Sequence, residues 1–354
     1  MIERVEKLRS KMREHDLDSF LITNEFNLRY LTGFTGTTGL ALITLEHAYF
    51  VTDFRYTEQA SEQCEGYKII KNVKPLYEEL GDLVNHLALA NMAFEEQTVT
   101  FFQYTELERL VECDLIPVTG IIESLREVKD VSEIETIRKA CQIADSAFEH
   151  ILTYIKPGMT EIQVANELDF YMRSLGASGV SFETIVASGL RSAMPHGVAS
   201  DKVIEEGDFI TIDFGCYYDG YVSDMTRTIS LGEPSDKLKE IYQIVKGAQQ
   251  RVLDVAKPGM TGIELDAVAR DYITEHGYGE AFGHSTGHGI GLEIHEGPNV
   301  SKVADKAFVP GNIITNEPGI YLPGIGGVRI EDDMLITEDG MDRLTHSTKE
   351  LIIL

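Results

Sequence analysis

The chain has 354 residues, of which 43% are hydrophobic and 25% are charged, a composition typical of a soluble globular protein with about two domains. Its 31 Lys and Arg face 58 Asp and Glu, giving a net charge of −27. A nucleic-acid backbone or an anionic membrane surface would be repelled by this charge, so we expect neither as a partner.

The N-terminal stretch indicates a protein of the cytoplasm. Residues 1–23 are predicted to form a charged amphipathic helix followed by a strand, without the apolar core of a signal peptide. No apolar run approaches the roughly 18 residues of a membrane span. The four cysteines are widely spaced and form no CxxC pair, which suits reduced thiols. We therefore expect a cytoplasmic protein.

Residues 1–122 are predicted to form an α/β domain, because helical patterns alternate with short apolar runs. The candidate strands are SFLIT (19–23), LALIT (40–44), AYFVTD (48–53), YKIIK (67–71) and MAFEE (92–96). A long helix is predicted from Val131 to Tyr154, because its apolar residues recur on one side. We expect this helix to open a second domain, over residues 123–354.

The second domain contains an internal repeat. Residues 156–176 and 257–277 lie 101 positions apart and agree at eight of 21 positions, including the shared KPGMT. Helix capping by Thr and Gly accounts for part of this agreement, but not for the whole KPGMT motif. We therefore interpret the two segments as the start of two duplicated halves.

Each half carries histidine and then two carboxylates. The first half has His196, Asp213 and Asp224, and the second has His284, His288, His295, Glu317 and Glu331. If the halves pack about a pseudo-twofold axis, the four acids meet.

Asp213 and Asp224 lie in TIDFGCYYDGYVSDMTR, which predicts two strands joined by a tight turn. A four-residue loop, 217–220, would pair the two acids directly. A two-residue loop, Asp219-Gly220, would leave them diagonal on one face, and either arrangement keeps them within reach. A three-residue loop would separate them, and an exposed polar hairpin remains the alternative to a binding site.

Two buried carboxylates side by side repel each other, and a cation is the simplest compensation. Four acids and one imidazole suit two divalent ions that share a water. Because oxygen ligands predominate and no thiolate is offered, we expect Mn²⁺, with Co²⁺, Zn²⁺ or Fe²⁺ as alternatives. The competing interpretation of GHSTGHGIG (283–291) as a phosphate loop lacks a GxGxxG or GKT pattern.

Several motifs resemble the pita-bread metallopeptidases, in the branch of Xaa-Pro dipeptidase (prolidase) and aminopeptidase P. The motifs are MPHG, TIDFGCYYDGYVSDMTRT, GHSTGHGIGLEIHEGP, NEPGIY and GVRIEDD, preceded by YLTGFTGTTGLALIT, FVTDFRY and SLREVKDVSEIETIRKA. The resemblance covers nearly the whole chain. It implies an α/β (α+β) protein, with an N-terminal creatinase/prolidase-like domain followed by a pseudo-twofold catalytic domain.

The resemblance also implies roles for individual residues. The metal ligands would be Asp213, Asp224, His288, Glu317 and Glu331, and all five are present. His196, His284 and His295 match histidines that line the substrate pocket, Arg329 matches an arginine near the metals, and Tyr321 matches the tyrosine after EPG. As a mechanistic hypothesis, we expect Glu317 also to pass a proton from the attacking water to the prolyl nitrogen. The oxyanion would be met by a metal and by His295 or His196.

Two positions depart from the family pattern. Asn316 stands where many relatives have an apolar residue, which should change the local polarity. Asn299 stands where some prolidases place an arginine for the substrate carboxylate, which puts a strict preference for dipeptides in doubt.

We therefore expect metal-dependent hydrolysis of the bond before proline, in Xaa-Pro dipeptides. The alternatives are an aminopeptidase P that acts on longer peptides, and a pseudo-peptidase that only binds them. A creatinase-like hydrolase would lack the acids. A cation for the proline carboxylate could come from Arg329, Arg191 or Arg55 of a second subunit. The resemblance further implies a homodimer.

Overall fold

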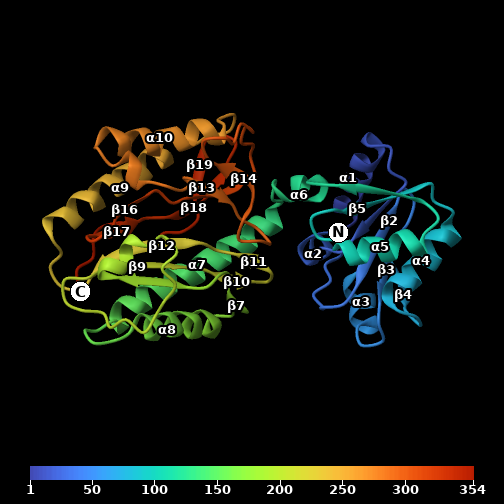
Figure 1. Cartoon of the computed structure of the whole chain (residues 1–354), viewed down its shortest axis with the longest axis horizontal. Helices are drawn as coiled ribbons and strands as arrows, with labels where there is room; N and C mark the ends of the chain where they lie inside the picture. The colour runs from blue at the N-terminus through green and yellow to red at the C-terminus, as the bar shows by residue number, and fades with distance from the viewer. The chain divides into compact units, whose positions relative to one another are not determined.

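The computed structural model describes residues 1–354 and divides into two compact units, Met1–Arg126 and Glu127–Leu354 (Figure 1). The first unit ends with helix α6 (Ile121–Arg126), and the boundary expected after residue 122 lies inside this helix. No helix combines the length and the apolar composition needed to cross a membrane.

The first unit is a six-stranded sheet with helices, and all five predicted strands are present. The strand order is β4-β3-β2-β1-β5-β6, with β2 antiparallel to both β1 and β3 and the other neighbours parallel. The elements are α1 (Ile2–Glu14), β1 (Ser19–Ile22), α2 (Glu25–Thr32), β2 (Leu40–Thr44), β3 (Ala48–Thr52), α3 (Thr57–Gln63), β4 (Lys68–Lys71), α4 (Leu76–Leu87), β5 (Asn91–Glu95), α5 (Phe101–Leu110) and β6 (Asp114–Val118).

The sequence did not predict strand β6, which contains Pro117. Proline cannot donate to a strand ladder, so within sheets it is confined to edge strands and irregular positions. β6 lies at the edge of the sheet and pairs only with β5. Proline is rare in strands, so the residue pattern did not indicate one here. Pro117 is tolerated because one side of β6 is unpaired.

The second unit begins with α7 (Val131–Tyr154), which has the predicted bounds. Asp130 caps its first turn in a capping box with Glu133. The remaining elements of the first half are α8 (Glu161–Ser174), β7 (Gly179–Val180), β8 (Ile185–Ser188), the 3-10 helix η1 (Gly189–Ala193), β9 (Phe209–Phe214), β10 (Cys216–Tyr218), β11 (Tyr221–Val222) and β12 (Met225–Ser230).

The second half repeats this plan. Its elements are α9 (Asp236–Val255), α10 (Gly262–Glu275), the 3-10 helix η2 (Gly279–Ala281), β13 (Gly287–Gly289), β14 (Glu296–Val300), β15 (Ile313–Asn316), β16 (Gly319–Leu322), β17 (Gly326–Arg329), β18 (Asp332–Ile336) and β19 (Met341–Arg343). Thr160 begins α8 and Thr261 begins α10, each in a capping box. The KPGMT repeat is therefore the turn that joins two helices in each half, α7 to α8 and α9 to α10.

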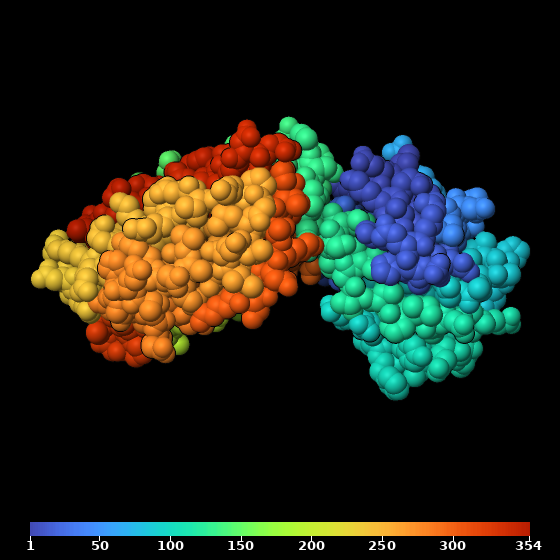
Figure 2. Space-filling view, turned by 90° about the horizontal axis from the view of Figure 1, so that it is seen from above, coloured from blue at the N-terminus to red at the C-terminus, as the bar shows by residue number.

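Each half of the second unit has its own hydrophobic core. One packs α7 and α8 against β9 and β12, and the other packs α9 and α10 against β15, β17 and β18. Within this unit the strands lie between the two helix pairs (Figure 1), and α9 and α10 form the outer face seen in Figure 2. Inner strands of both halves thus meet in the middle of the unit, where the candidate acids lie.

Candidate metal centre and active site

The hairpin that carries Asp213 and Asp224 has the two-residue loop. Asp219 and Gly220 both have positive φ, 44° and 78°, which is the geometry of a type I′ turn. Tyr218 pairs with Tyr221, and further along Asp213 pairs with Thr226. Asp224 lies two positions before Thr226, so the two acids are diagonal neighbours on one face, as the shorter loop requires.

The second half presents its two acids at the ends of neighbouring strands. Glu317 directly follows β15 and Glu331 directly precedes β18, and these strands pair through Asn316 and Asp332. The two halves join here, because the Glu331 N–H donates to the Thr226 carbonyl at 3.0 Å. The Thr226 hydroxyl donates to Glu331 Oε2 at 2.6 Å. The backbone thus places the acids of both halves side by side.

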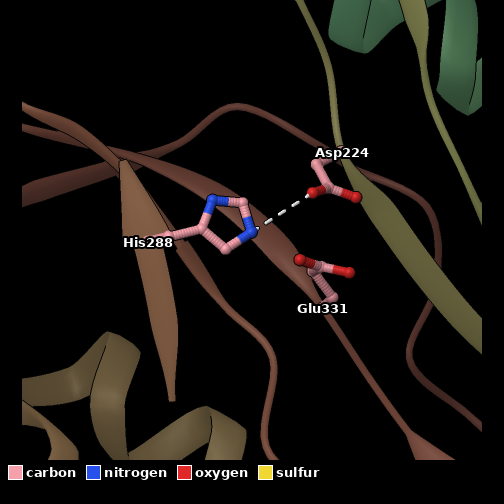
Figure 3. A group of neighbouring side chains, drawn as sticks. All are labelled: Asp224, His288 and Glu331. Atoms are coloured by element: carbon pink, nitrogen blue, oxygen red, sulfur yellow. Dashed lines mark ion pairs between the residues drawn. The ribbon is translucent and has the colours of Figure 1, made fainter. Parts of the chain in front are cut away.

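All five predicted ligands line one cavity of about 580 Å³. Asp224, His288 and Glu331 each offer a ligand atom within 4.8 Å of the others, and Figure 3 shows these three side chains pointing toward one another. His288 Nε2 lies 3.6 Å from Asp224 Oδ2 and 3.5 Å from Glu317 Oε1. Asp213 lines the same cavity from β9.

The protonation of His288 favours a cation at this position. Its Nδ1 lies 3.1 Å from the Gly289 carbonyl, which can only accept, so Nδ1 carries the proton. Burial also lowers the pKa of His288 to about 4, which keeps the ring neutral. The unprotonated Nε2 therefore faces two carboxylates, and a divalent cation would satisfy all three acceptors.

The four carboxylates are only partly compensated, because Arg329 is the one cation among the residues that line the cavity. Burial raises the pKa of Asp224 and of Glu331 well above their ordinary values, and neighbouring acids raise both further. Burial raises the pKa of Glu317 to about 8. Oδ1 of Asp213 and Oδ1 of Asp224 are buried without a hydrogen-bond partner. Because buried unpaired acceptors are costly, these residues fit a bound divalent metal.

Arg329 connects the acids to the wall of the cavity. Its guanidinium donates to Asp213 Oδ2 at 2.6 Å, to Thr226 Oγ1 at 3.1 Å and to Tyr321 Oη at 2.8 Å. Arg329 is 3% exposed, so these contacts use its charge inside the protein. It orients Asp213 and is not free to bind a substrate carboxylate.

His284 lines the cavity, but both of its ring nitrogens are occupied. Nδ1 lies 2.8 Å from the Ser285 carbonyl and must donate to it. Nε2 then accepts from the Tyr321 hydroxyl at 2.8 Å, and burial lowers the pKa of His284 to about 4. The ring is fixed by its neighbours and offers no free nitrogen to a substrate.

His196 and His295 also line the cavity. The rings of His295 and His288 are 4.4 Å apart, edge to face. Burial, followed by the charge of His196, lowers the pKa of His295. Neither ring has a hydrogen-bond partner of the kind that holds His284, so both could donate to a ligand.

Several candidates from the sequence lie outside the cavity. The Asn316 amide is fully buried and donates to the Gln249 carbonyl of α9 at 2.9 Å, so its polarity serves the contact between strand and helix. Arg191 donates to Glu161 and to the Val198 carbonyl and does not line the cavity. Arg55 belongs to the first unit, where it pairs with Asp53 at 2.7 Å.

The sequence reasoning missed Thr226 and Asp333. Thr226 donates to Glu331, and Asp333 Oδ2 accepts from the Asp224 N–H at 3.0 Å and from the Cys141 thiol at 3.3 Å. The strand period places Thr226 on the same face as Asp224, which was a usable signal. No pattern indicated Asp333, because its partners come from the other half.

Comparison with known proteins gives two family matches. Residues 135–338 match the metallopeptidase family M24, and residues 4–128 match the creatinase/prolidase N-terminal domain. A relative from Pyrococcus furiosus described as an Xaa-Pro dipeptidase is 42% identical, over 99% of this chain and 100% of its own.

Solved structures are similar to this chain along nearly its whole length. An Xaa-Pro dipeptidase from Bacillus anthracis is 55% identical with a TM-score of 0.99, covering 100% of this chain and 99% of its own. An X-Pro aminopeptidase from Thermotoga maritima is 42% identical with a TM-score of 0.92, covering 98% and 100%. Similar proteins thus carry both descriptions.

Proposed function

Because the chain belongs to the metallopeptidase family M24, with a creatinase/prolidase N-terminal domain, we propose that it is an Xaa-Pro dipeptidase. The observation that carries the proposal is the convergence of five ligand-type side chains on one cavity from both halves of the second unit. Relatives described as Xaa-Pro dipeptidases support the substrate class.

We assign the metal site to Asp213, Asp224, His288, Glu317 and Glu331. These residues would hold a divalent ion, which when bound would supply Lewis-acid chemistry: a lower pKa for a bound water and a polarised carbonyl oxygen. The oxygen-rich ligand set favours Mn²⁺ over metals that prefer thiolates. A pseudo-peptidase that only binds peptides would have no need for so complete a set of acids.

Glu317 is the proposed proton carrier. It accepts a proton from the attacking water as the oxygen bonds to the carbonyl carbon before proline. When the carbon–nitrogen bond breaks, the same carboxyl gives that proton to the prolyl nitrogen. The products are the free amino acid and proline, and Glu317 returns to its starting state.

His295 and His196 are the proposed donors to the oxyanion, because their rings line the cavity and are not held as His284 is. Arg329 is a positioning residue, because it orients Asp213. His284 is itself held in place by Tyr321. A proline ring needs an apolar wall, which Phe182, Ile185, Pro195, Val198 and Ile294 supply.

One observation favours a second candidate, an aminopeptidase for longer Xaa-Pro peptides. Among the cavity-lining residues Arg329 is the only Lys or Arg, and it is bonded to Asp213. Position 299 offers an amide rather than a cation. The second unit by itself therefore provides no free cation for the carboxylate of a dipeptide.

The test compares hydrolysis of Ala-Pro with that of Ala-Pro-Ala by Mn²⁺-loaded protein. A dipeptidase has the higher kcat/KM on Ala-Pro, and an aminopeptidase on Ala-Pro-Ala. Hydrolysis of neither peptide would remove the proposed function, and full activity after removal of metal would remove the metal site.

We also propose a cytoplasmic homodimer. All four cysteines are free thiols, as expected in a reducing compartment. The dimer rests on the resemblance to a family whose members are often dimers. Light scattering of the purified protein measures the subunit number directly.

A further inference from the structure

One acid of the cavity has no part in the proposed metal site. Glu183 lines the cavity and is exposed. Its carboxylate has no hydrogen bond or ion pair, unlike Asp213, which is held by Arg329. Glu183 therefore presents an uncompensated negative charge to whatever enters.

The strand register fixes where this charge lies. Ile185 of β8 pairs with Asp213 of β9, so Ile185 stands beside a proposed ligand. Glu183 lies two residues before Ile185, about 7 Å further along the extended chain. Ile185 is 5% exposed whereas Glu183 is exposed, so the charge sits at the outer end of this wall.

No cation of the cavity opposes Glu183. Arg329 is buried and donates to Asp213, Thr226 and Tyr321. The net charge of −27 adds to a potential that attracts positive groups. The carboxylate of Glu183 therefore faces the outer cavity without an opposing cation.

The geometry of an Xaa-Pro substrate decides which positive group reaches Glu183. Its α-amino group is bonded to the carbon next to the scissile carbonyl, so it stays at the depth of the metal ligands. The side chain before proline is free to extend along the wall, and a lysine carries its ammonium on a flexible four-carbon stem.

We propose that Glu183 is a specificity-determining residue that favours a cationic side chain, Lys or Arg, in the position before proline. The inference rests on the proposed function. It adds to the position of the cleaved bond a preference for the residue before proline. It assigns Glu183 to binding and not to the chemical step.

The test measures kcat and KM for Lys-Pro, Met-Pro and Glu-Pro with Mn²⁺-loaded wild type, Glu183→Gln and Glu183→Lys. In wild type we expect kcat/KM in the order Lys-Pro, Met-Pro, Glu-Pro. Glu183→Gln should lower the ratio of Lys-Pro to Met-Pro by about twofold to fivefold, mainly through KM, as for an exposed ion pair. Glu183→Lys should favour Glu-Pro over Lys-Pro.

Glu205→Gln is the matched control, because Glu205 is exposed and does not line the cavity. It should leave the ratios unchanged. The wild-type ratio should also fall as NaCl rises from about 0.05 M to about 0.5 M, since salt screens exposed charges. Unchanged ratios in Glu183→Gln, with Met-Pro still cleaved, would overturn the inference alone. Failure to cleave any of the three peptides would overturn the proposed function with it.

Discussion

Single side chains in the cavity differ in what remains free for chemistry. His284 and Arg329 have their polar atoms committed to Tyr321, Ser285 and Asp213, whereas His295 does not. Residue type alone placed all the pocket histidines in one class. Hydrogen-bond partners separate those that position from those that can donate to a substrate.

Glu317→Gln should remove the proton carrier without removing volume. We expect kcat for Ala-Pro to fall by about 10²-fold to 10⁴-fold, the usual contribution of a general base. The metal-free variant should melt no lower than metal-free wild type near pH 8, because the substitution removes a buried acid. Glu338→Gln, at an exposed position, serves as control. Wild-type turnover in Glu317→Gln would exclude the assigned role.

His295→Ala should reduce kcat by about 10²-fold to 10³-fold, as loss of an oxyanion donor does. Metal content, measured by atomic absorption, should stay at the wild-type level because His295 is not among the proposed ligands. His276→Ala changes a histidine outside the cavity and should have little effect on either quantity. Unchanged kcat in His295→Ala would leave the oxyanion to His196.

The hairpin of β9 to β12 is the element that brings the first two acids together. Gly215 interrupts it, and a Cβ at that position would lie 1.8 Å from the Ser223 carbonyl oxygen. The backbone at Gly215 thus lies very close to the backbone at Ser223, the residue before Asp224. Glycine at 215 is therefore a requirement of the site, whereas Gly220 only serves the turn.

Gly215→Ala should force the strands apart and lower metal affinity together with activity. Gly220→Ala provides the matched comparison, because its φ of 78° is unfavourable for alanine by about 1 kcal/mol but no ligand moves. Isothermal titration with Mn²⁺ and urea unfolding separate the two outcomes. Equal metal affinity in both variants would contradict the importance of the close approach.

At the scale of the molecule, the acids of the proposed metal site repel one another where the two halves join. Asp224, Glu317 and Glu331 all have pKa values raised by burial. Below about pH 6.5 the buried histidines, whose pKa values are lowered, oppose this effect, but from about pH 6.5 to about pH 8 the acids make the metal-free folded state bind more protons than the unfolded state. The stability of the metal-free protein must fall as the pH rises through this range.

We expect the Tm of metal-free protein to fall by about 5 °C or more between about pH 6.5 and about pH 9. Mn²⁺ should raise the Tm most at the alkaline end and should release protons on binding. Differential scanning calorimetry and titration in buffers of different ionisation enthalpy measure both effects. A metal-free Tm that rises with pH over this range would contradict the burial of the acids.

The sequence by itself determined the local pieces of this protein. Periodicity and capping predicted α7 to its end residues, five strands of the first unit and the repeat that begins with KPGMT, because such signals act between residues close in the chain. Only the tertiary structure decided the two-residue hairpin register, the bonds that occupy His284 and the contact of Asp333 with Asp224. These depend on distances between segments more than 30 residues apart or on a choice of turn, and local propensity does not contain them.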